Sequence, residues 1–359
     1  MRFNSFVCIL LFSSYSFSNY QYETILDDLN DAWSFVFLSE DKILYTEMPG
    51  NLKIASVKDK SITSIANVPN VQYVSQGGLS EVILDPNFKN NNKIYLTYSS
   101  KDKNGKSTLF LMSAELSQNA LVNKKIIFQA LAPRRTAVHL GAKLAFLNDG
   151  TLLLTSGDGF DHREKAQRLD NHFGKIIRIN TDGSVPKDNP FVGVEGALED
   201  IYSFGHRNMQ GLIVTSSGQI YEHEHGPKGG DEINIISPSL NYGWPAITYG
   251  IDYSGAVISP FTEKDGMEQP LLHWTPSIAP SDMIFYENDV YPELQNSFLV
   301  TALVSKDVKK VTFINDTNIQ ESIFSDLGER LRNIQNSPSG IIYLLTDGPS
   351  GKLVKVLPN

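Results

Sequence analysis

The sequence predicts an all-β protein, a six-bladed β-propeller, and two observations support this fold. One short pattern recurs six times: a turn, an apolar strand with an aromatic residue or leucine, and a second turn. Most copies are followed by another alternating strand, while helical periodicity is weak throughout the chain. Such units, spaced roughly forty to eighty residues apart, are typical of radial repetition around a central axis.

The six copies of the pattern begin at Asp41, Asn92, Asp149, Ser217, Asn296 and Ser339. The strands that follow them begin at Leu52, Thr108, Gly174, Asp231, Lys309 and Lys352. The spacing between copies is uneven, so the longer intervals should be loops, which often carry binding residues. The segment Gln21–Asn30 has a helical composition, but in a propeller we expect it to be a strand that pairs with the last blade and closes the ring.

Length and charge limit the classes of protein to consider. The chain has 359 residues, 41% of them hydrophobic, and no stretch rich in Pro, Gly or Ser divides it. We therefore predict that residues 19–359 form one propeller domain. The formal net charge of −9 argues against nucleic acid or an anionic membrane as the general partner.

The first eighteen residues resemble a secretory signal peptide. Arg2 provides the positive end, Phe6–Phe12 is apolar but too short to span a bilayer, and Ser16 and Ser18 give a small-x-small cleavage pattern. A buried N-terminal strand is the alternative. The single cysteine lies in this segment, so the mature chain would have no disulfide, and we predict secretion to a bacterial periplasm.

The stretch 203–245 holds the densest set of polar groups in need of partners. Its turns at Gly226-Pro227 and Gly229-Gly230 can present backbone carbonyls, and acidic residues follow them directly. Oxygen ligands of this kind suit a hard cation such as calcium. Arg207 offers a planar fork for a carboxylate or a quinone oxygen. We therefore expect a metal and an anionic organic cofactor to meet in this stretch.

Ten motifs, in order from about Trp33 to the C-terminus, resemble the soluble pyrroloquinoline-quinone (PQQ) aldose sugar dehydrogenases of the glucose/sorbosone dehydrogenase family. The motifs are VSQGGLSEVILDPNF, VHLGAKLAFLNDG, TSGDG, GKIIRINTDGSVPKDNPF, IYSFGHRNMQGL, EHGPKGGDEINI, NYGWP, GIDYSG, GERLRNI and YLLTDGPSGKL. Any one of them is a weak signal, whereas ten in order are specific. The resemblance implies a six-bladed propeller, in agreement with the repeats.

The resemblance implies a catalytic pair. His139 matches the general base, which would take a proton from a sugar hydroxyl and so must be neutral near pH 7. Asp158 matches the carboxylate that orients this base, as in other His-carboxylate pairs. Read alone, His139 could be a core or loop histidine and Asp158 a turn residue.

The resemblance also implies residues that contact PQQ. Arg207 would face the quinone oxygen that gains negative charge, although alone it could equally form a structural ion pair. Arg330 and Arg332 would supply cations for the three PQQ carboxylates; the alternative is a solvated strand face. The full set is Gln76, Arg207, Asn208, Tyr253, Ala302, Leu303, Val304, Lys306, Arg330, Leu331 and Arg332.

One departure from the family concerns an expected lysine. Relatives carry an Ala-Leu-Lys run whose lysine contacts PQQ, but here the run is Ala302-Leu303-Val304. Lys306 follows two residues later, and in an extended segment it would point to the same side as Val304, about 6.6 Å away at about 3.3 Å per residue. We expect either that Lys306 substitutes for the missing lysine or that PQQ binds less tightly.

Two calcium roles follow from the resemblance. The backbone carbonyls of Gly226 and Pro227 match those that hold calcium against PQQ. Glu232 and Tyr242 match a second, structural calcium site, with Tyr242 contributing its backbone oxygen. Alone, Glu232 would be read as an exposed strand carboxylate. The run Glu222–His225 suggests zinc, but we see no further His or Cys to complete a zinc site.

Together these features predict a PQQ- and calcium-dependent oxidation of aldose sugars to lactones. The chain shows no haem motif, so the electrons should pass to an external acceptor. A calcium-dependent lactonase would have the same architecture but no use for the three arginines. The alternative that is not an enzyme is a binding propeller that has lost its cofactor. The sugar, the acceptor and the oligomeric state are left open by the sequence.

Overall fold

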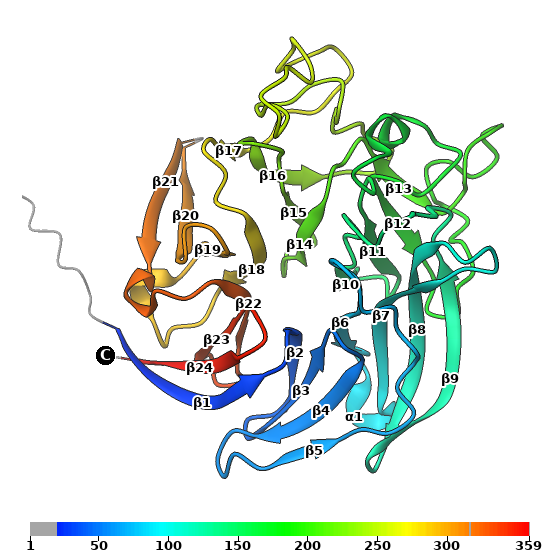
Figure 1. Cartoon of the computed structure of the whole chain (residues 1–359). Coiled ribbons are helices and arrows are strands. Elements are labelled where there is room, and N and C mark those ends of the chain that lie inside the picture. Colours follow the sequence, from blue (N-terminus) through cyan, green and yellow to red (C-terminus); the bar gives the residue numbers. More distant parts are fainter. Residues whose placement is uncertain (1–19, 316, 359) are drawn as a thin grey trace, which may run out of the picture.

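The computed structural model describes residues 20–315 and 317–358, and in that part of the chain twenty-four strands form six four-stranded antiparallel sheets. The sheets are arranged radially as the blades of a propeller, which confirms the predicted fold class (Figure 1). The predicted signal peptide, residues 1–18, lies outside the described residues. Across the described residues, no helix combines the length and apolar character needed to cross a membrane.

Each blade is built from strands that follow one another in the chain. Blade 1 has β2 (Ala32–Ser39), β3 (Lys42–Glu47), β4 (Asn51–Ser56) and β5 (Ile62–Ser64); blade 2 has β6 (Leu79–Leu84), β7 (Lys93–Lys101), β8 (Ser107–Ser117) and β9 (Ala120–Gln129). Blade 3 has β10 (Leu144–Phe146), β11 (Leu152–Ser156), β12 (Lys175–Ile179) and β13 (Ile201–Phe204). Blade 4 has β14 (Met209–Val214), β15 (Ile220–Glu224), β16 (Asp231–Ile236) and β17 (Leu272–Trp274). Blade 5 has β18 (Pro280–Tyr286), β19 (Ser297–Ala302), β20 (Val308–Ile314) and β21 (Thr317–Ile323).

The last blade contains both ends of the described chain. It consists of β22 (Leu331–Asn336), β23 (Ile342–Thr346), β24 (Gly351–Leu357) and β1 (Gln21–Leu29). β1 pairs antiparallel with β24, as predicted for the segment that closes the ring. Between residues 20 and 358, in the part of the chain that the structure describes, helical structure is limited to α1 (Phe88–Asn91) and three 3-10 turns at Arg163–Gln167, Pro292–Leu294 and Ser325–Leu327.

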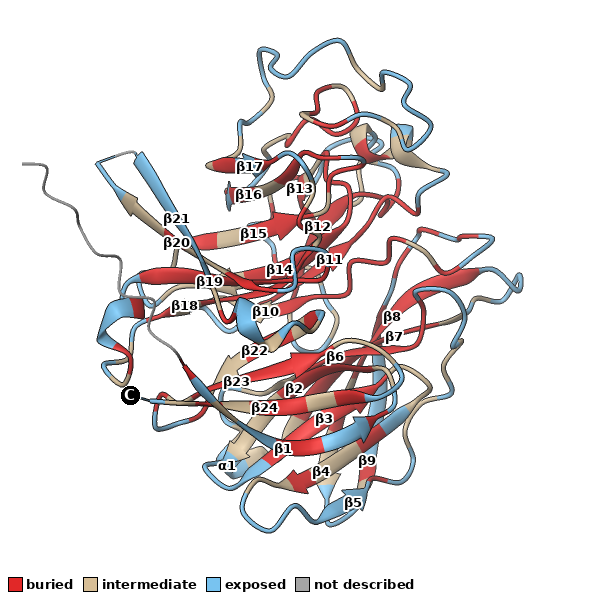
Figure 2. Cartoon of the chain, turned by 60° about the vertical axis from the view of Figure 1, so that its left-hand side comes forward, coloured by how far each residue is buried: buried red, intermediate tan, exposed pale blue. Residues whose placement is uncertain are grey.

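The repeated sequence pattern corresponds to the second and third strands of every blade. These strands have a neighbour on each side, and several are buried along their whole length, as β11 and β19 are. The outermost strands β5 and β21 are almost entirely exposed (Figure 2). A middle strand therefore needs apolar residues on both faces, which explains why the sequence signal was strongest there.

A buried ion cluster joins three blades near the propeller axis. Lys143 Nζ lies 2.5 Å from Glu81 Oε2 of β6 and 2.8 Å from Asp282 Oδ1 of β18. Ser34 of β2 donates to Glu81 at 2.7 Å, and Asn333 of β22 donates to Asp282 at 2.5 Å. Because the charges are buried and paired, they fix the innermost strands relative to one another.

Candidate active site

Two neighbouring cavities contain most of the predicted site residues. The first, of about 360 Å³, is called the arginine cavity here; its lining includes Trp33, Gln76, Asn208, Gln210, His225, Leu303, Arg330 and Arg332. The second, of about 380 Å³, is called the histidine cavity; its lining includes His139, Asp158, Phe160, Asp161, Arg163, Glu164, Arg207, Pro227, Asp252 and Tyr253. Consecutive residues, such as Arg207 and Asn208, line the two cavities, so they share walls.

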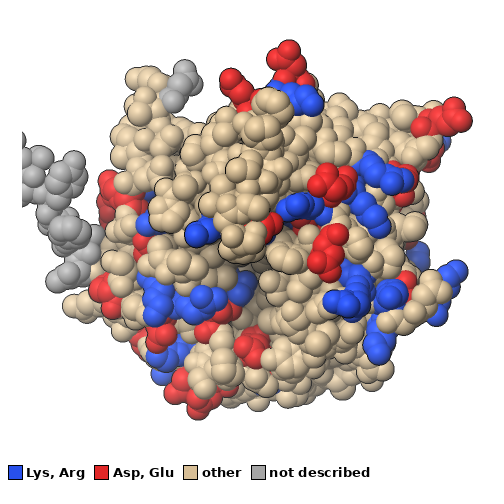
Figure 3. Space-filling view, turned by 45° about the horizontal axis from the view of Figure 1, so that its top comes forward, with Lys and Arg blue, Asp and Glu red and all other residues tan. Residues whose placement is uncertain are grey.

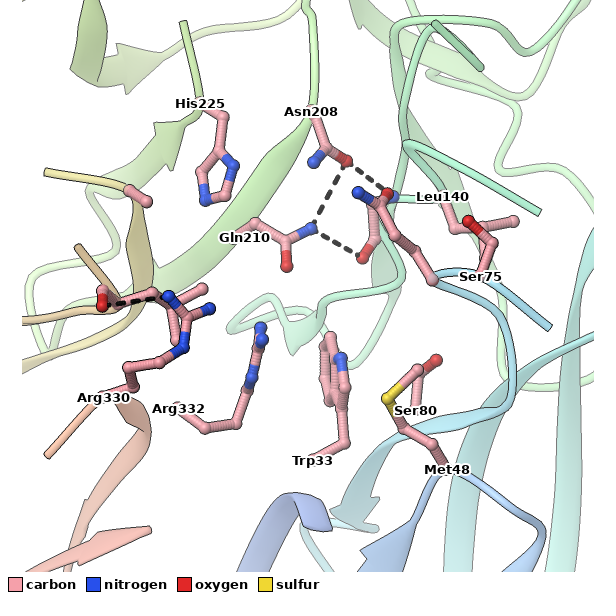
Figure 4. A pocket seen from close by; sticks show the side chains of 14 residues that line it. Trp33, Met48, Ser75, Ser80, Leu140, Asn208, Gln210, His225, Arg330 and Arg332 are labelled. Carbon is pink, nitrogen blue, oxygen red and sulfur yellow. Dashed lines mark hydrogen bonds between the residues drawn. The ribbon is translucent and has the colours of Figure 1, made fainter. Parts of the chain in front are cut away.

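Two arginines of blade 6 project into the arginine cavity and face Asn208 and Gln210 (Figure 4). Both are held by Asp347: Arg330 Nε donates to Oδ2 at 3.0 Å, and Arg332 Nη2 donates to Oδ1 at 2.6 Å. Sequence reasoning missed Asp347, although it ends the last copy of the repeat. One carboxylate shared by two guanidiniums leaves net positive charge, so the cavity suits an anionic ligand.

The structure brings together some of the predicted PQQ contacts and separates others. Gln76, Asn208, Leu303, Arg330 and Arg332 line the arginine cavity, whereas Arg207 and Tyr253 line the histidine cavity. Ala302 and Leu331 are fully buried strand residues, and neither belongs to the lining of these cavities.

The expectation that Val304 and Lys306 lie on one side of an extended segment is wrong. β19 ends at Ala302, and Lys306 adopts a left-handed backbone with φ 56°. The chain turns there because Asp307 is buried and accepts hydrogen bonds from Ser305 and Lys309. Both Val304 and Lys306 are exposed, and neither lines the arginine cavity.

We therefore expect Lys306→Ala to leave PQQ affinity nearly unchanged. Arg332→Ala, by contrast, should weaken PQQ binding by about 1.5–3 kcal/mol, the range for a hydrogen bond to a charged group. A PQQ titration of both variants in calcium distinguishes the two residues. A large loss in Lys306→Ala would show that this lysine reaches the cofactor despite the turn, and Val304→Lys would then add little.

His139 and Asp158 form a buried pair that lines the histidine cavity. His139 Nδ1 lies 2.7 Å from Asp158 Oδ1, and their exposed fractions are 6% and 1%. Because the carboxylate accepts, Nδ1 carries the proton and Nε2 is the ring atom free to act as a base. Burial lowers the pKa of His139, despite its bond to Asp158, so the imidazole is neutral at pH 7.

The backbone of His139 is held in a strained, left-handed conformation with φ 44°. Its N–H donates to Gln76 Oε1 at 2.8 Å, and its carbonyl accepts from Arg134 Nη2 at 3.2 Å. Gln76 thus links the arginine cavity to the base, a role that the turn-like sequence around it did not suggest. The fully buried Arg134 was not identified from the sequence.

Both carboxylate oxygens of Asp158 accept hydrogen bonds. Trp244 Nε1 donates to Oδ2 at 2.8 Å, and the backbone N–H of Phe160 donates to Oδ1 at 2.8 Å. Burial alone would raise the pKa of Asp158, but its hydrogen bond with His139 and nearby positive charge bring the pKa below its usual value. Asp158 therefore stays ionised and holds one tautomer and one orientation of the imidazole.

Arg207 is 3% exposed and makes no side-chain ion pair with any residue of the described ranges. Its Nη1 donates to the carbonyls of His225 and Gly226, at 2.9 and 2.6 Å. The guanidinium also lies over the rings of Trp244 and Tyr253, 5.3 and 6.0 Å from their centroids. Because backbone carbonyls carry only partial charge, the cation remains available to a developing anion in the cavity.

The loop that carries Gly226 and Pro227 is held by Asp231. Asp231 accepts from the backbone N–H of Gly226 and from Ser277, Ile278 and Ala279. With both oxygens occupied, Asp231 has a structural role in this loop, although its position suggested a calcium ligand. Gly226 must be glycine because an added Cβ would lie 2.2 Å from the carbonyl oxygen of Gly229.

The predicted structural calcium residues line a third, very small cavity of about 10 Å³. Glu232 and Tyr242 both reach it, together with Glu224, which the sequence prediction had not included. The Tyr242 hydroxyl is already engaged by Ser237 and Ile235, which leaves its backbone oxygen as the group it could offer. Burial raises the pKa of both glutamates above the usual range, so a cation here would be favourable. The donor set and the size fit one calcium ion.

The zinc-like run Glu222–His225 is arranged differently from the sequence expectation. His225 Nε2 lies 2.7 Å from the carbonyl of Pro280, away from the glutamates. A histidine from another segment, His206, instead comes within 4.8 Å of Glu222 and Glu224. The expectation that no further histidine approaches this run was therefore wrong, because His206 lies shortly before β14, the strand that pairs with β15 in the same blade.

The model of the glucose/sorbosone dehydrogenase family matches residues 29–355. The chain belongs to the glucose/sorbosone dehydrogenase family. It is thus an oxidoreductase of the sugar dehydrogenase type, and the resemblance inferred from the ten motifs is confirmed.

Known members of the glucose/sorbosone dehydrogenase family match along almost the whole chain. The aldose sugar dehydrogenase YliI of Escherichia coli is 36% identical over 94% of this chain and 92% of its own. The solved apo-form of the soluble E. coli aldose sugar dehydrogenase superposes with a TM-score of 0.91 at 34% identity, covering 95% of this chain and 100% of that chain. A glucose dehydrogenase crystal structure has the same TM-score at 38% identity, covering 94% and 100%.

Proposed function

We propose that this protein oxidises aldose sugars to lactones with bound PQQ and calcium, and passes the electrons to an external acceptor. The observation that carries the proposal is the buried His139–Asp158 pair, which faces one cavity beside Arg207 while two further arginines line the adjoining cavity. The names of the family relatives support a sugar substrate. The PQQ-bound aldose sugar dehydrogenase of Streptomyces coelicolor has a similar fold, with a TM-score of 0.75 at 22% identity.

The residues of the arginine cavity fit a planar anion of the size of PQQ. Its volume lies within the usual range for ligand pockets, and Arg330 and Arg332 provide charge-assisted donors for carboxylates. Gly226 and Pro227 would hold calcium through their backbone carbonyls once Arg207 released the Gly226 carbonyl that it now binds, and Glu232 and Tyr242 would hold the second ion. When bound, PQQ supplies the hydride acceptor and calcium polarises its carbonyl.

Residues of the chain itself would accept the proton of the sugar hydroxyl and stabilise the negative charge that develops during oxidation. His139 Nε2 would take the proton of the anomeric hydroxyl, and Asp158 would stabilise the imidazolium that forms. Arg207 would stabilise negative charge that develops in the cavity during oxidation. The buried position of the pair limits the access of water to the base. We also propose export to the periplasm, on the basis of the sequence of residues 1–18.

Reconstitution tests this function. The purified chain, mixed with PQQ and calcium, should reduce a redox dye when an aldose is added, and omission of any one component should abolish the reaction. PQQ binding without dye reduction for any aldose would favour the binding propeller. Calcium-dependent hydrolysis of lactones without PQQ would favour the lactonase.

A further inference from the structure

We propose that Phe160 and Asp161 select the sugar, and that the histidine cavity accepts neutral or cationic pyranoses and rejects anionic sugars such as uronates and sugar phosphates. This inference rests on the proposed function, since it names the substrate class of the same site.

Phe160 forms an apolar surface next to the base. Its ring is 49% exposed and meets the His139 ring edge-on, with centroids 5.3 Å apart. Tyr253, which is 59% exposed, lies nearly parallel to Phe160 with centroids 6.4 Å apart. Two large aromatic rings left open to solvent in one cavity are unfavourable unless a ligand covers them. The C–H face of a pyranose provides such a surface.

The position of Phe160 is coupled to the catalytic pair. The residue has a left-handed backbone with φ 64°, which is uncommon for an aromatic residue. Its N–H donates to the same Asp158 oxygen that binds His139 Nδ1. The carboxylate that orients the base thus also holds the backbone of Phe160, so a sugar packed on Phe160 is placed relative to Nε2.

The charges that line the histidine cavity are mostly negative. Four carboxylates, Asp158, Asp161, Glu164 and Asp252, stand against two guanidiniums, Arg163 and Arg207, which leaves two negative charges on the protein groups when His139 is neutral and before any calcium binds at Pro227. Arg163 is already paired with Asp252 at 3.2 Å and with Glu164 at 3.5 Å. Acidic and basic side chains are interspersed over the face of the molecule in view in Figure 3.

Asp161 is the carboxylate most able to act on a ligand. It is exposed, and its carboxylate makes no hydrogen bond or ion pair with any residue between 20 and 315 or between 317 and 358. Asp158 is committed to His139 and Trp244, and Asp252 to Arg163. An unpaired charge at the cavity wall attracts a sugar ammonium and repels a sugar carboxylate or phosphate, and salt weakens both effects.

The test compares D-glucosamine, D-glucose and D-glucuronate with the PQQ- and calcium-loaded protein, at a pH where the amine is protonated. The kcat/KM values should fall in that order. Asp161→Asn should reduce the ratio of glucosamine to glucuronate about tenfold at low ionic strength, and the wild-type ratio should shrink in about 0.5 M salt. Asp27→Asn is the matched control, because Asp27 is exposed on the outer strand β1.

Phe160→Ala tests the apolar surface separately. It should raise KM for all three sugars about tenfold, as expected for the loss of one aromatic contact, while PQQ affinity is unchanged. Phe261→Ala is the control, because Phe261 is 55% exposed but lines neither cavity. If Phe160→Ala instead weakens PQQ binding with KM unchanged, the ring belongs to the cofactor site and its proposed role is overturned.

Sugar binding is also measured without turnover, by saturation-transfer NMR on the calcium-loaded protein without PQQ. If no sugar is oxidised, but the NMR signals show binding that decreases from glucosamine through glucose to glucuronate and that changes in Asp161→Asn, the proposed function fails and the selectivity stands. If glucuronate binds and reacts as well as glucose, or if Asp161→Asn behaves like Asp27→Asn, the inference is overturned.

Discussion

Replacing His139 with glutamine is expected to lower turnover of the PQQ-loaded protein by roughly 10² to 10⁴, the usual contribution of a positioned general base. His139 is the histidine whose Nδ1 is fixed by a buried carboxylate while its ring lines the cavity. PQQ affinity should change little, because the arginines that bind the anion lie in the adjoining cavity. Stopped-flow dye reduction and a PQQ titration measure the two quantities.

Two further variants separate catalysis from folding. His139→Asn tolerates the left-handed backbone at this position better than glutamine, so it should show the same loss with less effect on stability. His273→Gln is the control, because His273 is exposed on β17 and lines neither the arginine nor the histidine cavity. A parallel loss of PQQ binding in both His139 variants would show that the residue is structural.

His139 also determines how kcat/KM falls at low pH. Because burial lowers the pKa of His139, kcat/KM should stay level as pH falls towards about 6.5 and decline only below it. The sign follows from the neutral imidazole being the active form, which protonation removes. The His139 variants should lose this acid limb, whereas the His273 control should keep it.

The fold could be predicted because every blade repeats one burial pattern. The second strands are largely buried on both faces and most third strands alternate between buried and less buried residues, so all six copies were visible in the sequence, as in β11 and β24. The innermost and outermost strands could not be found in this way. β10 has only three residues, and β21 is exposed, so neither carries a periodic apolar signal.

The candidate site was predictable where the resemblance gave a residue its role. It was unpredictable where the role comes from a contact between two distant motifs that only the fold brings together. Arg330 and Arg332 were identified from one short motif, but Asp347, which holds both, lies on the next strand connection. Trp244 and Asp158 are 86 positions apart in the chain, and only the packing of blades 3 and 4 joins them. The Lys306 expectation failed because a buried Asp307 turns a segment that had been assumed to be extended.

Removing calcium is expected to abolish sugar oxidation and to lower the melting temperature together. An ion that binds only the native state stabilises it by about 2.7 kcal/mol at a hundredfold excess over its dissociation constant. In a chain of this length that corresponds to a shift of about 4 °C. We assign the loss of activity to the ion at Gly226 and Pro227 and the loss of stability to the ion at Glu232. Pro227 lines the histidine cavity, whereas Glu232 lines the small cavity, which Gly226 also lines.

Glu232→Gln separates these two sources. Glutamine has the shape of a protonated glutamate, so the variant should be about as stable as the wild type in chelator, yet it should gain little stability from added calcium. Glu321→Gln is the control, because Glu321 is exposed on β21, and it should show the full calcium-dependent shift. Calorimetry of all three proteins with and without calcium measures the shifts, and dye reduction is followed in parallel. Full activity of the wild type after exhaustive chelation would contradict the calcium assignment at Gly226 and Pro227, whereas an unchanged calcium shift in Glu232→Gln would contradict the one at Glu232.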